Sequence, residues 1–122
     1  MQRNPVGWFE IYVQDMARAK AFYEGVFGVS LQALESPGME MLAFPMADVP
    51  GASGALVKMD GCPSGGNSTL VYFSCADCAV EAARVKAGGG CVFKEKFAIG
   101  QYGFIALVSD PDGNMIGLHS MQ

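Results

Sequence analysis

The sequence has little charge, a single histidine and no cluster of basic residues, and each scarcity excludes a class of protein. Charged residues make up 16% of the 122 residues and apolar residues 51%, a balance that excludes broad disorder. The 8 basic side chains are scattered among 12 acidic ones, which argues against a nucleic-acid-binding surface. Nucleophilic catalysis has little support, because His119 is the only histidine and no Gly-x-Ser-x-Gly elbow occurs.

Long apolar runs are also absent. No run approaches the ~18 residues of a membrane span, and the first residues lack the apolar region of a secretory signal. We therefore expect a cytoplasmic protein that does not associate with membranes. In that compartment the four cysteines are expected to be reduced thiols: Cys62, Cys75, Cys78 and Cys91.

Two of these cysteines, Cys75 and Cys78, have the C-x-x-C spacing of some metal and redox sites. A zinc site needs a second pair or nearby histidines, and the surrounding sequence has neither. Cys75 ends a predicted strand and Cys78 falls in the first turn of a predicted helix. We favour packing of both thiols in a core and leave a redox role open.

Short strands and two helices are predicted along the chain. Asp15 and Asp77 are suited to cap the two helices, and Gly28 and the glycines after residue 87 are suited to end them. Apolar residues at helical spacing predict helices over residues 16–27 and 78–87. Alternating or β-branched runs predict strands over residues 6–13, 29–34, 40–46, 55–59, 69–75, 91–97, 102–108 and 115–119.

The same order of elements occurs twice, which is the main organisational feature of the sequence. Asp77 follows Asp15 by 62 positions (77 − 15), about half the chain. The pattern predicts one α+β domain made of two βαβββ modules, at about residues 5–60 and 69–122. Residues 61–68 are expected to be a flexible linker. We expect two mixed sheets whose concave faces enclose a pocket.

Several segments, in the order in which they occur along the chain, resemble a known family. They are the run from Phe9 to Asp15, Ala19 to Tyr23, Val26 to Gly28, Leu70 to Phe73, Ala87 to Gly89 and the run from Asp110 to Leu118. The chain resembles the vicinal-oxygen-chelate superfamily of glyoxalases, bleomycin-resistance proteins and dioxygenases. It is most similar to small bacterial proteins related to lactoylglutathione lyase. The resemblance implies a small-molecule ligand and a homodimer.

The resemblance also implies a divalent metal, held by His, Glu or Gln side chains from both modules. The family's ligand positions map onto Trp8, the vicinity of Val71, Gly117 and the strand over residues 55–59, where only Lys58 is polar. None of these residues is a metal ligand. We therefore expect no metal or other cofactor, and a shifted metal site is disfavoured.

Glu10 and His119 are the candidate catalytic residues. Each lies two positions from a mapped ligand position, Trp8 or Gly117, and thus on the same strand face. Alternatively, they bond to each other or to the backbone. The candidate ligand-binding residues are Trp8, Tyr12, Lys58, Tyr102 and Phe104. The alternative for the aromatic residues is that they fill a core.

Two functions are compatible with this pattern. The first is a metal-independent binding protein for a small molecule, as in bleomycin-resistance-type relatives. The second is a lyase or isomerase acting on a small carbonyl compound, with Glu10 as base and His119 as acid or clamp. A sensor or subunit role is a third option. The segment from Asp110 to Asn114 is predicted to be a hairpin turn, because its spacing does not match a calcium loop.

Overall fold

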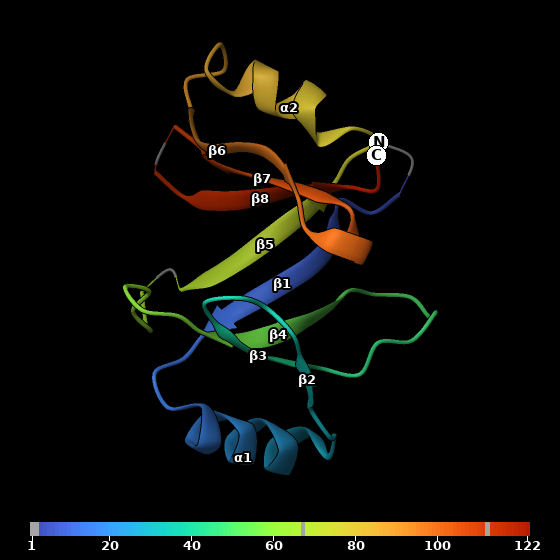
Figure 1. Cartoon of the computed structure of the whole chain (residues 1–122), viewed down its shortest axis with the longest axis vertical. Helices are drawn as coiled ribbons and strands as arrows, with labels where there is room; N and C mark the ends of the chain where they lie inside the picture. The colour runs from blue at the N-terminus through green and yellow to red at the C-terminus, as the bar shows by residue number, and fades with distance from the viewer. Residues whose placement is uncertain (1–2, 67, 112) are drawn as a thin grey trace. The chain divides into compact units, whose positions relative to one another are not determined.

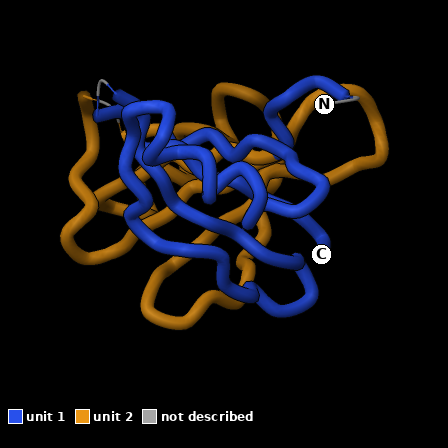
Figure 2. The backbone as a smooth tube through the Cα atoms, turned by 90° about the horizontal axis from the view of Figure 1, so that it is seen from above, with its two compact units in different colours: residues 1–7, 70–122 blue, residues 8–69 orange. Residues whose placement is uncertain are grey.

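The chain folds into two compact units, which Figure 2 colours separately. The computed structural model describes residues 3–66, 68–111 and 113–122. Unit 2 is Trp8–Thr69, and unit 1 is Met1–Gly7 together with Leu70–Gln122. The described residues contain no helix long and apolar enough to cross a membrane. Asn67 of the predicted linker and Asp112 of the predicted turn lie outside the described residues.

Unit 2 contains one helix and a four-stranded mixed sheet with the order β2-β3-β4-β1. The β1–β4 pair is parallel, whereas β2–β3 and β3–β4 are antiparallel. The elements, labelled in Figure 1, are β1 (Val6–Tyr12), α1 (Met16–Phe27), β2 (Gln32–Leu34), β3 (Glu40–Ala43) and β4 (Ser53–Lys58). The first residues of β1 belong to unit 1, where the Ser74 amide donates to the Pro5 carbonyl over 2.8 Å.

Unit 1 repeats this pattern with the sheet order β5-β8-β7-β6. The β5–β8 pair is parallel, like the β1–β4 pair of unit 2, and the other two pairs are antiparallel. The elements are β5 (Thr69–Ser74), α2 (Cys78–Val85), β6 (Cys91–Ala98), a 3-10 turn η1 (Gly100–Tyr102), β7 (Phe104–Ser109) and β8 (Met115–Ser120). The predicted α+β class and the two βαβββ modules are therefore confirmed.

The predicted caps start both helices. The Asp15 carboxylate accepts from the Arg18 amide at 3.0 Å, and α1 ends at Gly28, whose φ of 65° suits a residue without Cβ. The Asp77 carboxylate accepts from the Ala79 amide at 3.0 Å. Helix α2 ends two residues earlier than predicted, at Val85.

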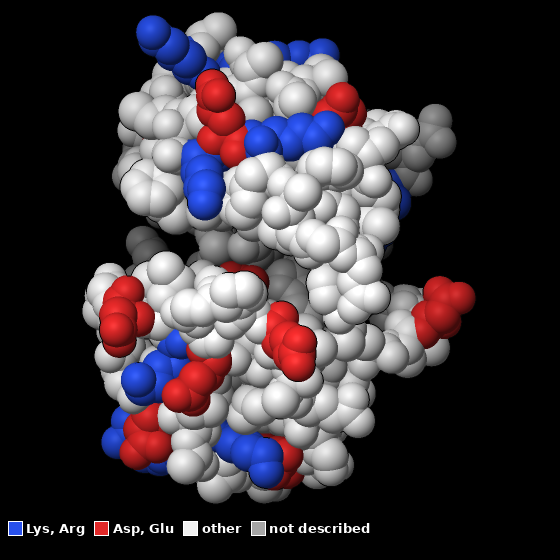
Figure 3. Space-filling model, viewed as in Figure 1, with Lys and Arg blue, Asp and Glu red and all other residues white. Residues whose placement is uncertain are grey.

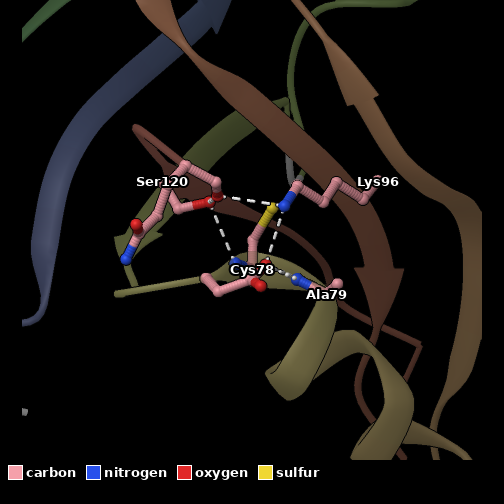
Figure 4. A network of polar contacts seen from close by, with 6 residues as sticks. Cys78, Ala79, Lys96 and Ser120 are labelled. Atoms are coloured by element: carbon pink, nitrogen blue, oxygen red, sulfur yellow. Dashed lines mark hydrogen bonds and ion pairs between the residues drawn. The ribbon is translucent and has the colours of Figure 1, made fainter.

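A polar network fixes the start of α2 (Figure 4). The Ser120 hydroxyl accepts from the Cys78 amide at 2.9 Å and donates to the Gln122 carbonyl at 2.8 Å. Lys96 donates to the Asp77 carboxylate at 2.8 Å. The first turn of α2 is thus bonded to both β8 and β6.

The two helices pack differently. In unit 1 the core consists of Cys78, Ala82, Ala106, Val108 and Leu118, with Cys75 packed against it. Both C-x-x-C thiols therefore lie in or beside the core, as the packing hypothesis predicted. No residue of α1 is buried, and its Phe22, Val26 and Phe27 are 59%, 59% and 63% exposed.

Two predicted segments differ in the structure. Tyr102 was predicted to begin a strand but ends η1, because Gly100 and Gly103 have positive φ and break the extended chain. The predicted flexible linker is hydrogen-bonded to the end of β1. The Tyr12 amide donates to the Ser68 carbonyl at 3.0 Å, and the Ser64 hydroxyl donates to the Tyr12 carbonyl at 2.7 Å.

The turn between β7 and β8 forms the predicted hairpin. The Asp110 carboxylate accepts from the backbone and side-chain nitrogens of Asn114, each at 2.9 Å. The Gly113 amide donates to the Asp110 carbonyl at 3.0 Å, and Gly113 has a φ of 84°. These bonds within the loop close the reversal.

Candidate functional site

Strand β1 brings three of the predicted site residues together. Side chains alternate along a strand, so Trp8, Glu10 and Tyr12 lie on one face of the unit 2 sheet. On the opposite face the Phe9 ring lies 5.6 Å from that of Phe44. Phe44 in turn contacts Tyr23 of α1, with 5.8 Å between ring centroids. Helix α1 therefore covers the Phe9 face, and the Glu10 face is the other one.

The Glu10 carboxylate is bonded by both flanking aromatic residues. Trp8 Nε1 donates to Oε2 at 3.3 Å, and the Tyr12 hydroxyl donates to Oε1 at 2.9 Å. Glu10 is only 7% exposed. A buried carboxylate is strongly destabilising without hydrogen-bond donors, and these two bonds contribute to its stabilisation.

Tyr12 remains a proton donor at neutral pH. Burial, followed by the negative charge of Glu10, raises the pKa of the Tyr12 phenol far above its ordinary value. The Cys62 thiol adds a smaller effect in the same direction. The phenol is therefore protonated at neutral pH and donates its hydrogen to the Glu10 carboxylate.

The rest of this sheet face is apolar or neutral. Cross-strand register places on it residues of β2, β3 and β4 without a basic side chain: Gln32, Leu34, Met41, Ala43, Ser53, Ala55 and Val57. Lys58 is paired with Glu40 in the register and lies on the opposite face from Glu10. The structure therefore does not bring Lys58 together with Trp8, Glu10 and Tyr12.

Two of the remaining candidates, His119 and Phe104, lie on opposite faces of the unit 1 sheet. His119 of β8 is half-buried, and its Nε2 lies 2.6 Å from the Tyr102 carbonyl oxygen. Strand alternation places His119 with Tyr72 and Gly117, on the face away from α2. Phe104 instead packs against the α2-facing core, so it belongs to the core and not to the surroundings of His119.

The mapped ligand positions do not fit the family's metal. A Cβ at Gly117 would overlap the Tyr72 ring, so a ligand side chain there requires the ring to move. Trp8, mapped onto another ligand position, donates to Glu10 and has no metal-binding atom. Among residues 3–66, 68–111 and 113–122, no group of three or more His, Cys, Asp or Glu can hold a metal ion.

A groove in unit 2 was not foreseen from the sequence. It has a volume of about 350 Å³ and is lined by Ser30, Gln32, Ala43, Phe44, Pro45 and Met46. None of the predicted site residues lines it. Its lining comes from β2, β3 and the adjoining loops, which carry no motif that marks a binding site in the sequence.

The C-x-x-C thiols lack the properties of a reactive pair. Cys78 is fully buried, which keeps reagents away from its sulfur. Burial and the neighbouring Glu81 carboxylate raise the pKa of the Cys75 thiol to about 11. Because the thiolate is the reactive form, this environment disfavours redox chemistry at neutral pH.

Sequence comparison places the chain in a family. Residues 6–118 match the model of the Glyoxalase/Bleomycin resistance protein/Dioxygenase superfamily, so the chain belongs to that superfamily. The curated relatives named "Putative glyoxylase CFP32", from Mycobacterium bovis and Mycobacterium tuberculosis, are each 32% identical over 107 residues. The match covers 87% of this chain but only 40% of the length of those relatives.

Solved structures share the fold at low sequence identity. Methylmalonyl-CoA epimerase from Mycobacterium tuberculosis matches with a TM-score of 0.71 and 15% identity, over 97% of this chain and 88% of that one. A superfamily member from Vibrio splendidus matches with a TM-score of 0.64 and 18% identity, over 92% and 95% of the two chains. At these identities the likeness shows the fold alone.

Proposed function

We propose that this protein binds a small molecule, without the family's metal, at the sheet face that carries Trp8, Glu10 and Tyr12. The observation that carries the proposal is the buried Glu10 carboxylate between two aromatic donors. Buried charge is costly, and its presence at a family ligand-binding strand favours a functional role over packing. The mapped metal positions, which offer no donors, support a ligand held by protein atoms alone.

Native mass spectrometry tests this proposal directly. Protein purified without chelator or added metal is expected to be metal-free and to carry or take up an organic molecule. Glu10→Gln keeps the size of the side chain and removes its charge, so it should reduce retention of that molecule. Glu40→Gln is the matched control, because Glu40 is an exposed residue on the opposite face of the same sheet.

Two outcomes would overturn this function. If the protein binds one metal ion per subunit and Glu10→Gln loses it, the site is metal-dependent. Equal retention of the organic molecule by both variants would place its binding elsewhere in the chain. The groove lined by Ser30 and Met46 would then be the next site to mutate.

A second candidate function is a lyase or isomerase acting on a small carbonyl compound. It is favoured by the 2.9 Å bond between Glu10 and a phenol that stays protonated, since this combines a proton acceptor with a donor. His119 would serve as an acid or as a polar clamp. Glu10→Gln should then abolish turnover while substrate binding persists, and His119→Ala should lower turnover. Turnover that survives both changes would exclude this assignment.

The remaining expectations are part of the same proposal. We expect a homodimer, which is supported by the exposed apolar side chains Phe22, Val26 and Phe27 on α1. On the basis of the resemblance we also propose a cytoplasmic location and the lack of a cofactor. We further propose a function similar to that of lactoylglutathione-lyase-like proteins. Analytical ultracentrifugation tests the dimer, and Val26→Glu on α1 is the variant expected to weaken it.

A further inference from the structure

We infer that the groove of unit 2 is a second binding site, which takes an uncharged molecule with a carboxamide group and an aromatic ring. The groove is lined by Ser30, Gln32, Ala43, Phe44, Pro45 and Met46. Strands β3 and β4 lie between Gln32 and Glu10 in the sheet, so at about 4.8 Å per strand the two residues are about 14 Å apart. The inference therefore goes beyond the proposed function and does not depend on it.

The groove exists because β2 and β3 separate at one end. Gln32 and Ala43 are the last paired residues at this end of the two strands. Beyond them the Leu31 amide donates to the Glu24 carboxylate of α1 at 2.8 Å. On the other side the Phe44 amide donates to the backbone of β4 at 2.9 Å. The two segments are thus bonded to different neighbours, which leaves a groove between them.

Both walls of the groove are held in place by bonds from outside it. The Glu24 carboxylate fixes the peptide group that joins Ser30 to Leu31. The Ser53 hydroxyl of β4 donates to the Pro45 carbonyl at 2.9 Å and so fixes the opposite wall. A site whose walls are already ordered loses little conformational freedom when a ligand binds. These bonds therefore favour a preformed site over a gap that closes.

Two polar side chains line the groove and are available to a ligand. Neither the Ser30 hydroxyl nor the Gln32 carboxamide forms a hydrogen bond with another of the residues that the structure describes, and both residues are exposed. A carboxamide has two N–H donors and a carbonyl acceptor, so a second carboxamide can exchange two hydrogen bonds with it. The Ser30 hydroxyl can donate or accept a third. This pair of side chains favours a ligand that carries a carboxamide.

The lining of the groove carries no charge. Charged side chains of both signs are visible over each unit in Figure 3, yet none of the six lining residues is charged. A charged ligand would lose part of its hydration in the groove and gain no counter-charge from the lining. Unit 2 contains seven acidic and three basic residues, which further disfavours an anion. The groove therefore favours an uncharged ligand.

The remaining lining residues suit a small ring. Ala43 is 1% exposed and leaves room above its short side chain, whereas Met46 is 52% exposed. A methionine thioether is flexible and makes favourable contacts with aromatic rings. The groove volume of about 350 Å³ lies at the lower end of the range for ligand sites. The ligand is therefore expected to be a small aromatic amide.

An NMR titration of the whole chain, labelled with nitrogen-15, tests the inference. The probes are benzamide, benzoate, the benzamidinium ion and acetophenone. They share one ring and differ in the attached group, which is a neutral amide, an anion, a cation or a ketone without N–H donors. We expect benzamide to shift the amide signals of Ser30, Gln32 and Met46 in a saturable way. It should bind at least about threefold more tightly than each of the other three probes.

Two variants with the same substitution localise the effect. Gln32→Leu removes the carboxamide from an exposed position and should weaken benzamide binding at least about threefold. Gln101→Leu is the matched control, because Gln101 is an exposed glutamine of unit 1, and should leave the affinity unchanged. The dispersion of the spectra shows whether each variant is folded. If Gln32→Leu is not, Ser30→Ala replaces it, with an expected loss of about twofold.

The outcomes distinguish the inference from the proposed function. Equal binding of benzamide and acetophenone, or tighter binding of either ion, would overturn the ligand class. Unchanged benzamide affinity in Gln32→Leu would overturn the assigned contact. Benzamide shifts centred on the Trp8 indole N–H and absent from the groove would overturn the second site and support the proposed function. If no probe gives a saturable shift, the inference fails, and the proposed function still depends on the mass spectrometry alone.

Discussion

Glu10 and Tyr72 occupy equivalent positions of the two units but make different contacts. The two residues are 62 positions apart in the sequence. Each lies on the first strand of its unit, on the sheet face away from the helix of that unit. Both are buried, at 7% and 6% exposure. In unit 2 the position holds a carboxylate bonded to Trp8 and Tyr12, whereas in unit 1 an aromatic ring covers Gly117. At this position unit 2 therefore has a hydrogen-bonded carboxylate and unit 1 has an aromatic ring.

The largest expected effects come from the glycines that the strands of the two units need. A Cβ at Gly54 would overlap the backbone oxygen of Phe9, whereas a Cβ at Gly117 would overlap only the Tyr72 ring. We expect Gly54→Ala to reduce the free energy of unfolding by about 3 kcal/mol and Gly117→Ala by about 1–2 kcal/mol, because a ring can move more readily than a strand. Urea denaturation measures both losses.

The double variant Gly117→Ala with Tyr72→Ala sharpens this first prediction. If the ring is the obstacle, the alanine at 117 should cost little once Tyr72 is truncated, so the two losses should not add. Additive losses, or a larger loss at Gly117 than at Gly54, would contradict the proposed difference between the units.

The second effect concerns the carboxylate that distinguishes unit 2. Tyr12→Phe removes the 2.9 Å bond to Glu10 and should lower the free energy of unfolding by about 2 kcal/mol, as expected for a hydrogen bond to a buried charge. Tyr102→Phe in unit 1 is the control, because this residue is 45% exposed, and should change it by less than about 0.5 kcal/mol. Similar losses in the two variants would remove the distinction.

A smaller effect is expected at high pH. Burial and the charge of Glu10 raise the pKa of the Tyr12 phenol, so the folded protein holds a proton that the unfolded chain loses above about pH 10. Stability from this proton is present in full below pH 10 and declines as the pH rises further. Since the ring is partly exposed, we expect a loss below about 1 kcal/mol at pH 11.

Chemical denaturation at pH 9 and pH 11 measures this decline. Tyr12→Phe should show a shallower dependence than the wild type, and Tyr102→Phe should behave as the wild type does. A native phenol that titrates with the other tyrosines, followed by absorbance near 295 nm, would show that Glu10 does not hold the Tyr12 proton.

The smallest effect separates the two helix caps. The Lys96 ammonium, followed by the Ala79 amide, holds the pKa of the Asp77 carboxyl below its ordinary value. Stability from this cap is therefore present above about pH 4 and is lost as the pH falls through the folded-state pKa. Asp77→Asn keeps a capping side chain but should flatten the acid dependence of Tm by roughly 1–2 °C.

Lys96→Met should reproduce the effect of Asp77→Asn, because it removes the partner that lowers the pKa. Asp15→Asn in unit 2 is the matched control, since its cap bonds the Arg18 amide. A change of equal size in Asp15→Asn would mean that the two caps respond to acid alike.

Local signals in the sequence were sufficient for the elements and their repetition. Helix α1 was predicted with its observed bounds, because Asp15 and Gly28 mark its ends unambiguously. The proximity of Trp8, Glu10 and Tyr12 also followed from the sequence, since a strand places alternate residues on one face. The bonds that Trp8 and Tyr12 donate to Glu10 were not predicted, because residue type gives the donors and acceptors but not which of them meet.

Features that depend on pairing between strands were not predictable. Lys58 was assigned to the site because it is the polar residue of its strand, but the register with Glu40 puts it on the other face. Phe104 was similarly assigned, and its place in the α2-facing core follows from pairing with Ser120. The residue pattern predicts each strand, but it does not predict the strand register. The register decides which face of a strand packs against the helix.

The linker described above has a consequence for any redesign of this chain. Ser64 and Ser68 bond to the carbonyl and the amide of Tyr12, so the segment between the repeats also holds the backbone of a proposed site residue. Cutting the chain there to obtain two separate polypeptides, or moving its termini there by circular permutation, would release Tyr12 at both of these atoms. The segment between two similar halves is usually the safest place to cut a duplicated protein, but in this chain it also positions the backbone of Tyr12.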